Sequence, residues 1–297
     1  MSDTTASLRR KINGAQELQS VVRTMKALAA ASIGQYEKSA QALADYYHAL
    51  ELGLAVCFRD MKPIAGSTKQ RHTGVGAVGA IVFGSDQGLV GQFNELVADH
   101  AFKTLSERSG TPHIWAVGER VYGRMNDIGL PLRGLFSVPS SIQAISPLVG
   151  QILIESEAHE QTELTELYLF YNRHLTGAVY QPIGQRLLPL DEPWRSQLSA
   201  LPWPTKKLPQ ILGEGTMTLR ALIREYLFVS IFRACAESLA SENASRLVAM
   251  QRADQNIDEL LGQLNGTFHR LRQNRIDEEL FDVISGFEAL SLPKNAR

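Results

Sequence analysis

The chain has 297 residues, of which 44% are hydrophobic and 21% are charged, close to the averages for globular proteins. This composition excludes wholesale disorder and allows one or two folded domains. The formal net charge of -1 gives no global basic field, so we expect no nucleic-acid partner and no recruitment to a membrane by charge.

The first predicted element is a long helix from about residue 5 to about residue 58. No proline interrupts the sequence before Pro63, and apolar or small residues recur with gaps of three or four, as in the seam of a coiled coil. We therefore interpret residues 1–60 as an N-terminal shaft helix. Its predicted seam consists of Leu8, Ile12, Ala15, Leu18, Val22, Met25 and Ala29. A basic face is formed by Arg9, Arg10, Lys11, Arg23 and Lys26.

The middle of the chain has the pattern of an α/β domain. Residues 61–78 are rich in the residue types of a linker loop. Residues 79–190 alternate short apolar runs with helical segments, which predicts βαβ units and a mainly parallel, Rossmann-like sheet. The expected strands are 80–84, 113–117, 133–138, 166–171 and 179–188, the last in a hairpin at the sheet edge. The expected helices are 94–106, 119–128 and 142–157.

The C-terminal part begins with a proline-rich linker, residues 191–215, that cannot be a continuous helix. Residues 216–297 then form a predicted C-terminal shaft helix, because proline is absent from Thr216 to Leu292 and apolar residues recur in gaps of four and three. About 75 helical residues would span on the order of 110 Å, which is too long to be buried in one domain.

These two long helices need a partner, since most helical stability in proteins comes from packing an apolar face. We expect the N- and C-terminal helices to pair into a long antiparallel coiled coil beside the central α/β domain; a compact intramolecular bundle is the alternative. Beyond the paired region Phe281, Ile284, Phe287 and Leu290 are expected to face outward. Exposed apolar rows of this kind mark a surface for another protein.

Two glycine-rich segments are candidate nucleotide sites. Gly74 to Gly79 matches a dinucleotide pattern, but a polar loop precedes it and a strand is expected after it, which is the reverse of the required order. Gly84 to Asn94 follows a predicted strand and opens a helix, yet it lacks the lysine and hydroxyl residue of a P-loop, which favours a structural turn.

The sequence does not indicate catalysis or metal binding. The seven histidines are scattered, HExxH and Gly-x-Ser-x-Gly are absent, and the two cysteines are too few for a zinc site or a disulfide framework. We therefore expect no catalytic residues, no cofactor and no metal. No window approaches the ~18 apolar residues of a membrane span, so membrane association is expected to be indirect.

Four segments resemble the gamma subunit of F-type ATP synthases. Val22-Arg-Thr-Met-Lys-Ala-Leu-Ala-Ala-Ala31 is similar to that family's start, and Leu239-Ala-Ser-Glu-Asn-Ala-Ser-Arg-Leu-Val-Ala-Met250 to its Leu-Ala-Ser-Glu-Gln-Ala-Ala-Arg-Met-Val-Ala-Met block. Ser85-Asp-Gln-Gly-Leu-Val-Gly91 and Val283-Ile-Ser-Gly286 resemble its central block and its ending. The resemblance thus reaches both ends and the middle of the chain in the right order.

The resemblance implies a central rotor shaft that couples proton or sodium flow through a membrane rotor to ATP synthesis or hydrolysis in a catalytic ring. The implied partners are the alpha and beta subunits of the ring, the epsilon subunit and the membrane c-ring. The shaft itself would not be an enzyme. The implied location is peripheral, on the cytoplasmic face of the bacterial inner (plasma) membrane.

The resemblance also implies which residues contact the catalytic ring. Met25 and Lys26 match the region that faces an acidic lever loop, and the tip residues Phe281, Ile284, Phe287 and Leu290 would turn in a hydrophobic sleeve. The contacts higher on the shaft match Glu242, Arg246, Met250, Arg272 and Gln273.

Departures from the family pattern are concentrated in the central block and near the last helix contacts. Gln87 replaces the usual arginine and Val90 the usual cysteine, while Asp277 and Glu278 stand where threonine and glutamine are common. This divergence resembles that of the alternative N-type ATPases, which are often sodium-linked. Two other classes remain open: a nucleotide-binding α/β enzyme with helical dimerisation arms, which predicts a ligand pocket at Gly84 to Gly91, and a coiled-coil scaffold.

Overall fold

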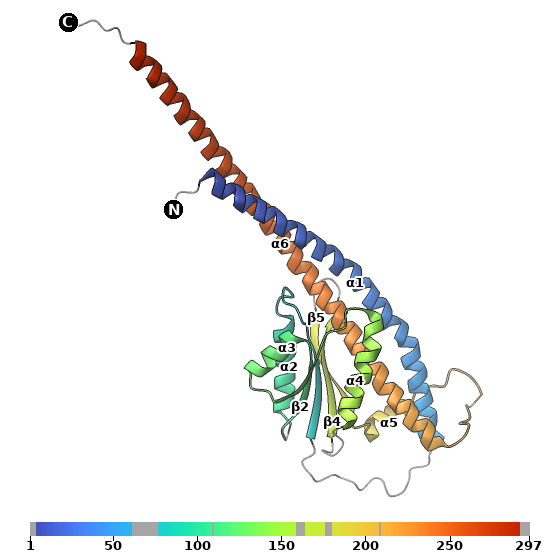
Figure 1. Cartoon of the computed structure of the whole chain (residues 1–297). Coiled ribbons are helices and arrows are strands. Elements are labelled where there is room, and N and C mark those ends of the chain that lie inside the picture. The colour runs from blue at the N-terminus through green and yellow to red at the C-terminus, as the bar shows by residue number, and fades with distance from the viewer. Residues whose placement is uncertain are drawn as a thin grey trace, which may run out of the picture. The chain divides into compact units, whose positions relative to one another are not determined.

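The computed structural model describes residues 4–60, 77–108, 110–158, 164–175, 180–207 and 209–291. The residues within Met1–Leu28 and Ala249–Arg297 form one compact unit, the helical unit, and those within Ala29–Val248 form a second, the sheet unit. In chain order, the elements are α1 (Thr5–Asp60), β1 (Ala77–Phe83), α2 (Phe93–Ser106), β2 (His113–Val117), α3 (Glu119–Asp127), β3 (Leu132–Phe136), a short 3-10 helix (Ile142–Ala144), α4 (Ile145–Ala158), β4 (Leu164–His174), β5 (Tyr180–Leu188), α5 (Glu192–Ser199) and α6 (Gly215–Ser291) (Figure 1).

The two terminal helices extend almost as the absence of proline predicts. Helix α1 has 56 residues and α6 has 77. The Thr4 side chain accepts a hydrogen bond from the Ser7 amide at 3.2 Å, which satisfies one of the unpaired donors at the start of α1. The predicted linker loop 61–78 falls outside the described residues up to residue 76, and residues 77 and 78 already belong to β1.

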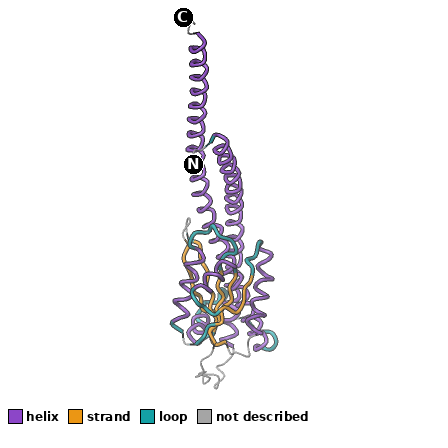
Figure 2. The backbone as a smooth tube through the Cα atoms, turned by 60° about the vertical axis from the view of Figure 1, so that its left-hand side comes forward, coloured by secondary structure: helices purple, strands orange, loops and turns teal. Residues whose placement is uncertain are grey.

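The five strands form one sheet in the order β3-β2-β1-β4-β5. The strands, orange in Figure 2, lie among the helices of the sheet unit. Strands β1, β2, β3 and β4 run parallel to one another, as the alternation of strands and helices predicts. Strand β5 pairs antiparallel with β4 at the edge, which confirms the expected hairpin. The carboxyl ends of β1, β2 and β3 therefore lie at the same side of the sheet, where the loop after β1 begins.

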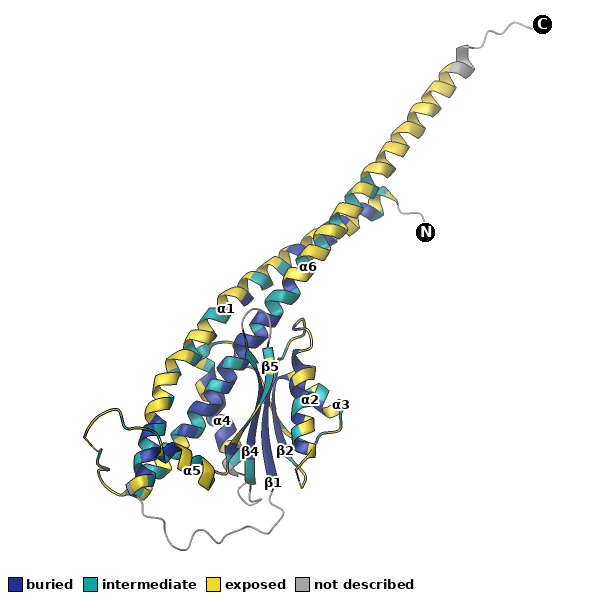
Figure 3. Ribbon diagram, turned by 180° about the vertical axis from the view of Figure 1, so that it is seen from behind, coloured by how far each residue is buried: buried dark blue, intermediate teal, exposed yellow. Residues whose placement is uncertain are grey.

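Helices cover both faces of this sheet. Helices α2 and α3 pack on one face, where Val97, Ala101 and Met125 contact the side chains of β1 and β2. On the other face α4 packs beside the part of α6 in the sheet unit, with Ile231, Ala236 and Leu239 of α6 buried (Figure 3). The α6 residues in this unit are thus part of the core of the α/β fold.

The proline-rich linker contains a short helix, α5, that the sequence analysis does not predict. Asp191 is its N-cap, accepting a hydrogen bond from the Trp194 amide at 3.2 Å, and a proline follows in the first turn. Trp194 packs edge-on against Phe58 of α1 and Tyr226 of α6. Aromatic packing therefore fixes this segment, although its prolines exclude a continuous helix.

In the helical unit, α1 and α6 pair in antiparallel directions. Leu8, Ile12 and Ala15 of α1 are buried, as predicted. The prediction that Leu18 continues this seam is wrong, because Leu18 is 62% exposed whereas its neighbour Gln19 is 8% exposed. Spacings of three and four residues fit both positions, and the polar partners of Gln19 on α6 decide between them.

Both cysteines are buried on helices. Burial raises the pKa of the Cys235 thiol well above its ordinary value. Within the described parts of the chain, no helix is both long enough and apolar enough to span a bilayer.

Candidate functional site

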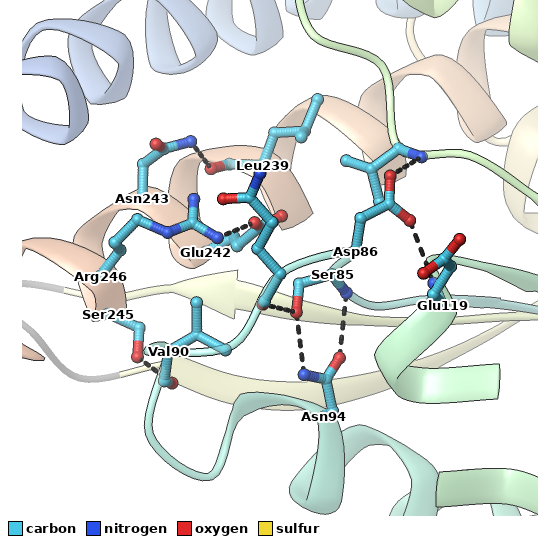
Figure 4. A network of polar contacts seen from close by, with 12 residues as sticks. Ser85, Asp86, Val90, Asn94, Glu119, Leu239, Glu242, Asn243, Ser245 and Arg246 are labelled. Carbon is cyan, nitrogen blue, oxygen red and sulfur yellow. Dashed lines mark hydrogen bonds and ion pairs between the residues drawn. The ribbon is translucent and has the colours of Figure 1, made fainter. Parts of the chain in front are cut away.

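The loop after β1, which carries the glycine-rich segment Gly84 to Asn94, is held by side chains of its own. The Ser85 amide donates to Asn94 Oδ1 and Asn94 Nδ2 donates to Ser85 Oγ, both at 2.9 Å. Ser85 Oγ donates in turn to the Gln87 carbonyl at 2.8 Å. Ser245 of α6 donates to the Val90 carbonyl, which ties the far end of the loop to the helix (Figure 4).

Asp86 connects this loop to the residues that follow β2 and β3. Its Oδ1 accepts from the Glu119 amide at the start of α3 at 3.0 Å, and its Oδ2 accepts from the Val138 amide after β3 at 2.9 Å (Figure 4). The carboxylate therefore occupies the helix N-terminus where an anionic ligand would bind. This geometry favours the structural turn over the nucleotide site for the Gly84 to Gly91 segment.

The cavity beside this loop has a volume of about 310 Å³, at the lower end of the range for small-molecule sites, and its charge is wrong for phosphate. It is lined by Asp86 and Glu242 as well as by Arg246, so two carboxylates face one guanidinium. Phosphate groups are bound by an excess of positive charge and backbone N–H groups. The alternative of a nucleotide-binding enzyme therefore gains no support from this cavity.

Glu242 and Arg246 form a buried ion pair on α6. Arg246 donates to Glu242 Oε1 at 2.6 Å, with side chains that are 13% and 6% exposed, respectively. Burial raises the pKa of the Glu242 carboxyl, Arg246 opposes this shift, and the charge of Asp86 adds to it. Glu242 Oε2 has no hydrogen-bond partner among the described residues. The pair is thus mostly enclosed within the sheet unit. Met250, which belongs to the helical unit, is only 1% exposed.

A second polar cluster lies between α1 and α6 in the helical unit. Lys26 Nζ lies 2.6 Å from Asp254 Oδ2, and Arg23 Nε lies 3.1 Å from Asp254 Oδ1. Gln19 donates to Asp254 Oδ1 at 3.4 Å and also to Asp258. The hydrogen bond from Lys26 lowers the pKa of Asp254, and Arg23 adds to this effect. Lys26, predicted to face a ring loop, is therefore engaged by the chain itself.

The end of α6 in the helical unit is exposed. All described side chains from 272 to 287 are exposed, among them Arg272 and Gln273 (Figure 3). Phe281 and Phe287 are 69% and 73% exposed, and Ile284 is exposed too, as the sequence analysis expects. Leu290 belongs to α6, but its side chain lies outside the described residues.

Sequence reasoning missed a second exposed apolar row, on α1. Leu18 and Val21 are more than half exposed, and so is Leu28, while Met25 between them is partly buried. The four residues of this row are spaced by three, four and three, which also fits a coiled-coil row. The sequence alone does not separate this row from the predicted seam, because Leu18 and Met25 fit both. Across the described ranges, no group of three or more His, Cys, Asp or Glu side chains is placed to hold a metal ion.

Comparison with known proteins gives matches over nearly the whole chain. A family model described as ATP synthase matches residues 4–290. The ATP synthase gamma chain of Desulfitobacterium hafniense is 28% identical, with 95% of this chain and 98% of that one covered. The gamma chain of Polynucleobacter necessarius is 25% identical, with 96% and 99% covered.

Solved structures show the same fold. A chain of the Euglena gracilis mitochondrial ATP synthase, in the OSCP/F1/c-ring part, is similar with a TM-score of 0.61 and 18% identity, covering 99% of this chain and 98% of that chain. A chain of the Tetrahymena thermophila central stalk and c-ring is similar with a TM-score of 0.55 and 19% identity, covering 78% and 99%.

The family match over residues 4–290 shows that the chain belongs to the ATP synthase family. Within this family it is a gamma subunit, which forms the central stalk of the rotor.

Proposed function

We propose that this gamma subunit couples ion flow through a membrane rotor to ATP chemistry in a surrounding ring, without catalysing any step itself. The observation that carries the proposal is the exposed end of α6, where Phe281 and Phe287 stand out from a helix that has no second helix beside them in the described chain. A single helix with exposed apolar side chains is poorly stabilised in water. It therefore fits an enclosing sleeve supplied by other subunits.

The proposed partners are the alpha and beta subunits of the ring around the helices, and the epsilon subunit and c-ring at the sheet unit. Membrane association is then indirect, and the proposed location is the cytoplasmic face of a bacterial inner membrane. The similarity to gamma chains of bacteria such as Polynucleobacter necessarius supports this location. The coupling ion, proton or sodium, is selected by other subunits in this scheme.

Three exposed surfaces are the proposed ring contacts. The tip residues Phe281, Ile284 and Phe287 would turn in an apolar sleeve. Apolar contacts are non-directional, so they would oppose rotation only weakly. The exposed pair Arg272 and Gln273 would form polar contacts that are made and broken in each turn. The third surface is the apolar row on α1, defined by Leu18, Val21, Met25 and Leu28.

In this proposal the other residues predicted to contact the ring instead make contacts within the chain. Met250 is left out of the contact set, because its side chain has almost no exposed surface. Glu242 and Arg246 are mostly buried, and we assign them to holding α6 against the loop after β1. Lys26 is held by Asp254 and contributes to the pairing of the helices.

The mechanism follows from unequal contacts. A ligand or partner shifts a conformational equilibrium only by its differential affinity for the two states. Because the three surfaces lie at different positions along two helices of unequal length, each catalytic subunit would meet a different surface as the shaft turns. The conformation and nucleotide affinity of each catalytic subunit would then change in sequence.

Assembly with the ring tests this proposal. Co-expression with matching alpha and beta subunits is expected to give a complex that co-elutes on size exclusion and hydrolyses ATP. Elution of the chain by itself, with no gain of ATPase activity in the ring, would rule the proposal out. ATPase activity or nucleotide binding in the isolated chain would instead support the enzyme alternative.

Replacing Arg272 and Gln273 with alanine is expected to lower ATP synthesis in the reconstituted complex while the chain stays folded, since both side chains are exposed and make no contact that the fold requires. ATP synthesis driven by an ion gradient and circular dichroism of the chain measure the two effects. The matched control is Arg275→Ala, which breaks only the exposed pair with Glu279. Unchanged synthesis would remove the proposed role of the 272–273 pair.

A further inference from the structure

Helix α1 carries two rows of residues with coiled-coil spacing in the helical unit. The inner row has gaps of four and three and faces α6; it consists of Leu8, Ile12, Ala15, Gln19, Val22 and Lys26. The outer row has gaps of three, four and three and consists of Leu18, Val21, Met25 and Leu28. The inner row contains two polar residues, whereas the outer row is entirely apolar. Within residues 18–28 hydrophobicity favours turning the outer row toward α6, whereas Leu8, Ile12 and Ala15 favour the observed orientation.

The polar residues of the inner row meet a polar residue in the matching row of α6. That row, Met250, Asp254, Ile257, Leu261, Leu264 and Phe268, also has gaps of four and three. Asp254 is its only ionisable member, and its carboxylate is 13% exposed. It accepts from Lys26 at 2.6 Å, from Arg23 at 3.1 Å and from Gln19 at 3.4 Å. Three donors from three successive turns of α1 thus converge on one carboxylate.

We propose that Gln19, Lys26 and Asp254 form a register lock, which fixes the axial position of α1 on α6 and keeps the apolar outer row of α1 turned outward, toward an apolar surface of the catalytic ring. The identity of the partner rests on the proposed function; the lock itself rests only on the contacts within the helical unit. Asp254 is a positioning residue in this scheme, since it does not contact the ring itself but sets which face of α1 is turned toward the ring.

Axial slip breaks the lock in either direction. A shift of one heptad would replace Gln19, Arg23 and Lys26 around Asp254 either by Ile12, Gln16 and Gln19 or by Lys26, Ala30 and Ile33. The first shift removes both cations, and the second removes Arg23 and the amide of Gln19. A mostly covered carboxylate that loses its hydrogen-bond partners is disfavoured, and a polar residue at one seam position is known to specify register in this way.

Rotation of α1 breaks the lock as well. Turning the outer row inward would bury Leu18, Val21 and Leu28 and would carry Gln19 and Lys26 away from Asp254. The observed orientation therefore leaves these three side chains unburied within the chain and keeps an apolar surface for a partner. Replacing a buried polar cluster by apolar residues often stabilises a helix pair while it removes the information that fixed its register.

The test uses an apolar-seam variant with Gln19→Leu, Lys26→Leu and Asp254→Leu. A reporter thiol, Val21→Cys, is placed in the exposed outer row, and its rate of reaction with a maleimide is measured in the full chain. The native cysteines are both buried, so they do not compete. We expect a several-fold slower reaction in the apolar-seam variant. With both the inner and the outer row apolar, α1 can turn either row toward α6, and the reporter thiol is covered when the outer row is turned inward. An unchanged rate would overturn the register lock.

The second readout separates the lock from a merely structural role. The apolar-seam variant is expected to unfold at the same or a higher temperature and yet to lose several-fold in ions pumped per ATP hydrolysed in the reconstituted complex. A lower unfolding temperature together with unchanged pumping would overturn the lock. Asp254→Glu should retain pumping where Asp254→Asn lowers it, and the matched control Asp99→Asn, which removes an exposed partner of Arg124, should change neither readout.

The two proposals fail differently. If the unmodified chain does not assemble with the ring, the proposed function fails and the maleimide reaction still tests the lock. If the unmodified complex pumps ions and the apolar-seam variant pumps equally well, the proposed function stands and the role of the lock is lost.

Discussion

Gly118→Ala is expected to destabilise the sheet unit by about 3 kcal/mol or more, because a methyl group at this position meets backbone that cannot move freely. Gly118 has a φ of 117° and precedes α3, and an added Cβ would lie 2.8 Å from both the carbonyl carbon and the carbonyl oxygen of Ser85. The Gly118 amide also donates to the Phe136 carbonyl at 2.9 Å, which holds the residue in place. Urea unfolding of the full chain measures the loss.

The matched control for this change is Gly129→Ala. Gly129 also has a positive φ, 77°, but no atom lies within 4 Å of an added Cβ. Only the conformational strain of the alanine remains there, about 1 kcal/mol. Equal losses at the two positions would show that the contact with Ser85 is not what makes Gly118 necessary.

Asp86→Ala is expected to destabilise the same unit by about 2 to 4 kcal/mol, because it leaves two backbone N–H groups without their acceptor. Those groups belong to Glu119 and Val138, at the carboxyl ends of two neighbouring strands. Thermal unfolding followed by circular dichroism measures the effect. Asp86→Asn keeps an acceptor oxygen for one amide and should lose less.

Asp127→Ala is the control for Asp86, because this carboxylate lies at the C-terminal end of the same helix α3, where a negative charge is unfavourable. It should leave stability nearly unchanged. If Asp86→Ala were equally harmless, the loop after β1 would need another anchor than the one assigned to it, and a ligand role for Asp86 would have to be reconsidered.

The elements of the fold could be predicted closely from local patterns. The absence of proline sets the extent of α1 and α6, so their ends were predicted within two residues. The alternation of strands and helices predicted the parallel sheet and its antiparallel edge strand. These features depend on short stretches of sequence that each carry their own signal.

Which face of α1 packs against α6 could not be predicted in the same way. Both Leu18 and Gln19 satisfy the spacing of a seam, and hydrophobicity favours Leu18, whereas the structure buries Gln19. The choice depends on Asp254, which lies 235 residues from Gln19 in the sequence. A long-range polar contact of this kind leaves no periodic trace in either helix alone.

The candidate contact residues divide for a similar reason. The pattern of α6 places Arg246 and Arg272 alike on a long helix, but Arg246 is mostly buried within the sheet unit, whereas Arg272 of the helical unit is exposed. Their difference is a property of packing. The exposed tip was predictable, since apolar positions there continue beyond the length of the N-terminal helix and Phe281 and Phe287 remain uncovered.

Direct observation of rotation tests the central claim most directly. The alpha and beta ring is fixed to a surface, and a probe is attached to the sheet unit of this chain, away from the proposed ring contacts. Addition of ATP is expected to turn the probe continuously in one direction, at a rate that follows ATP hydrolysis. A probe that stays still while the same complexes hydrolyse ATP would contradict the assignment of this chain as the rotating shaft.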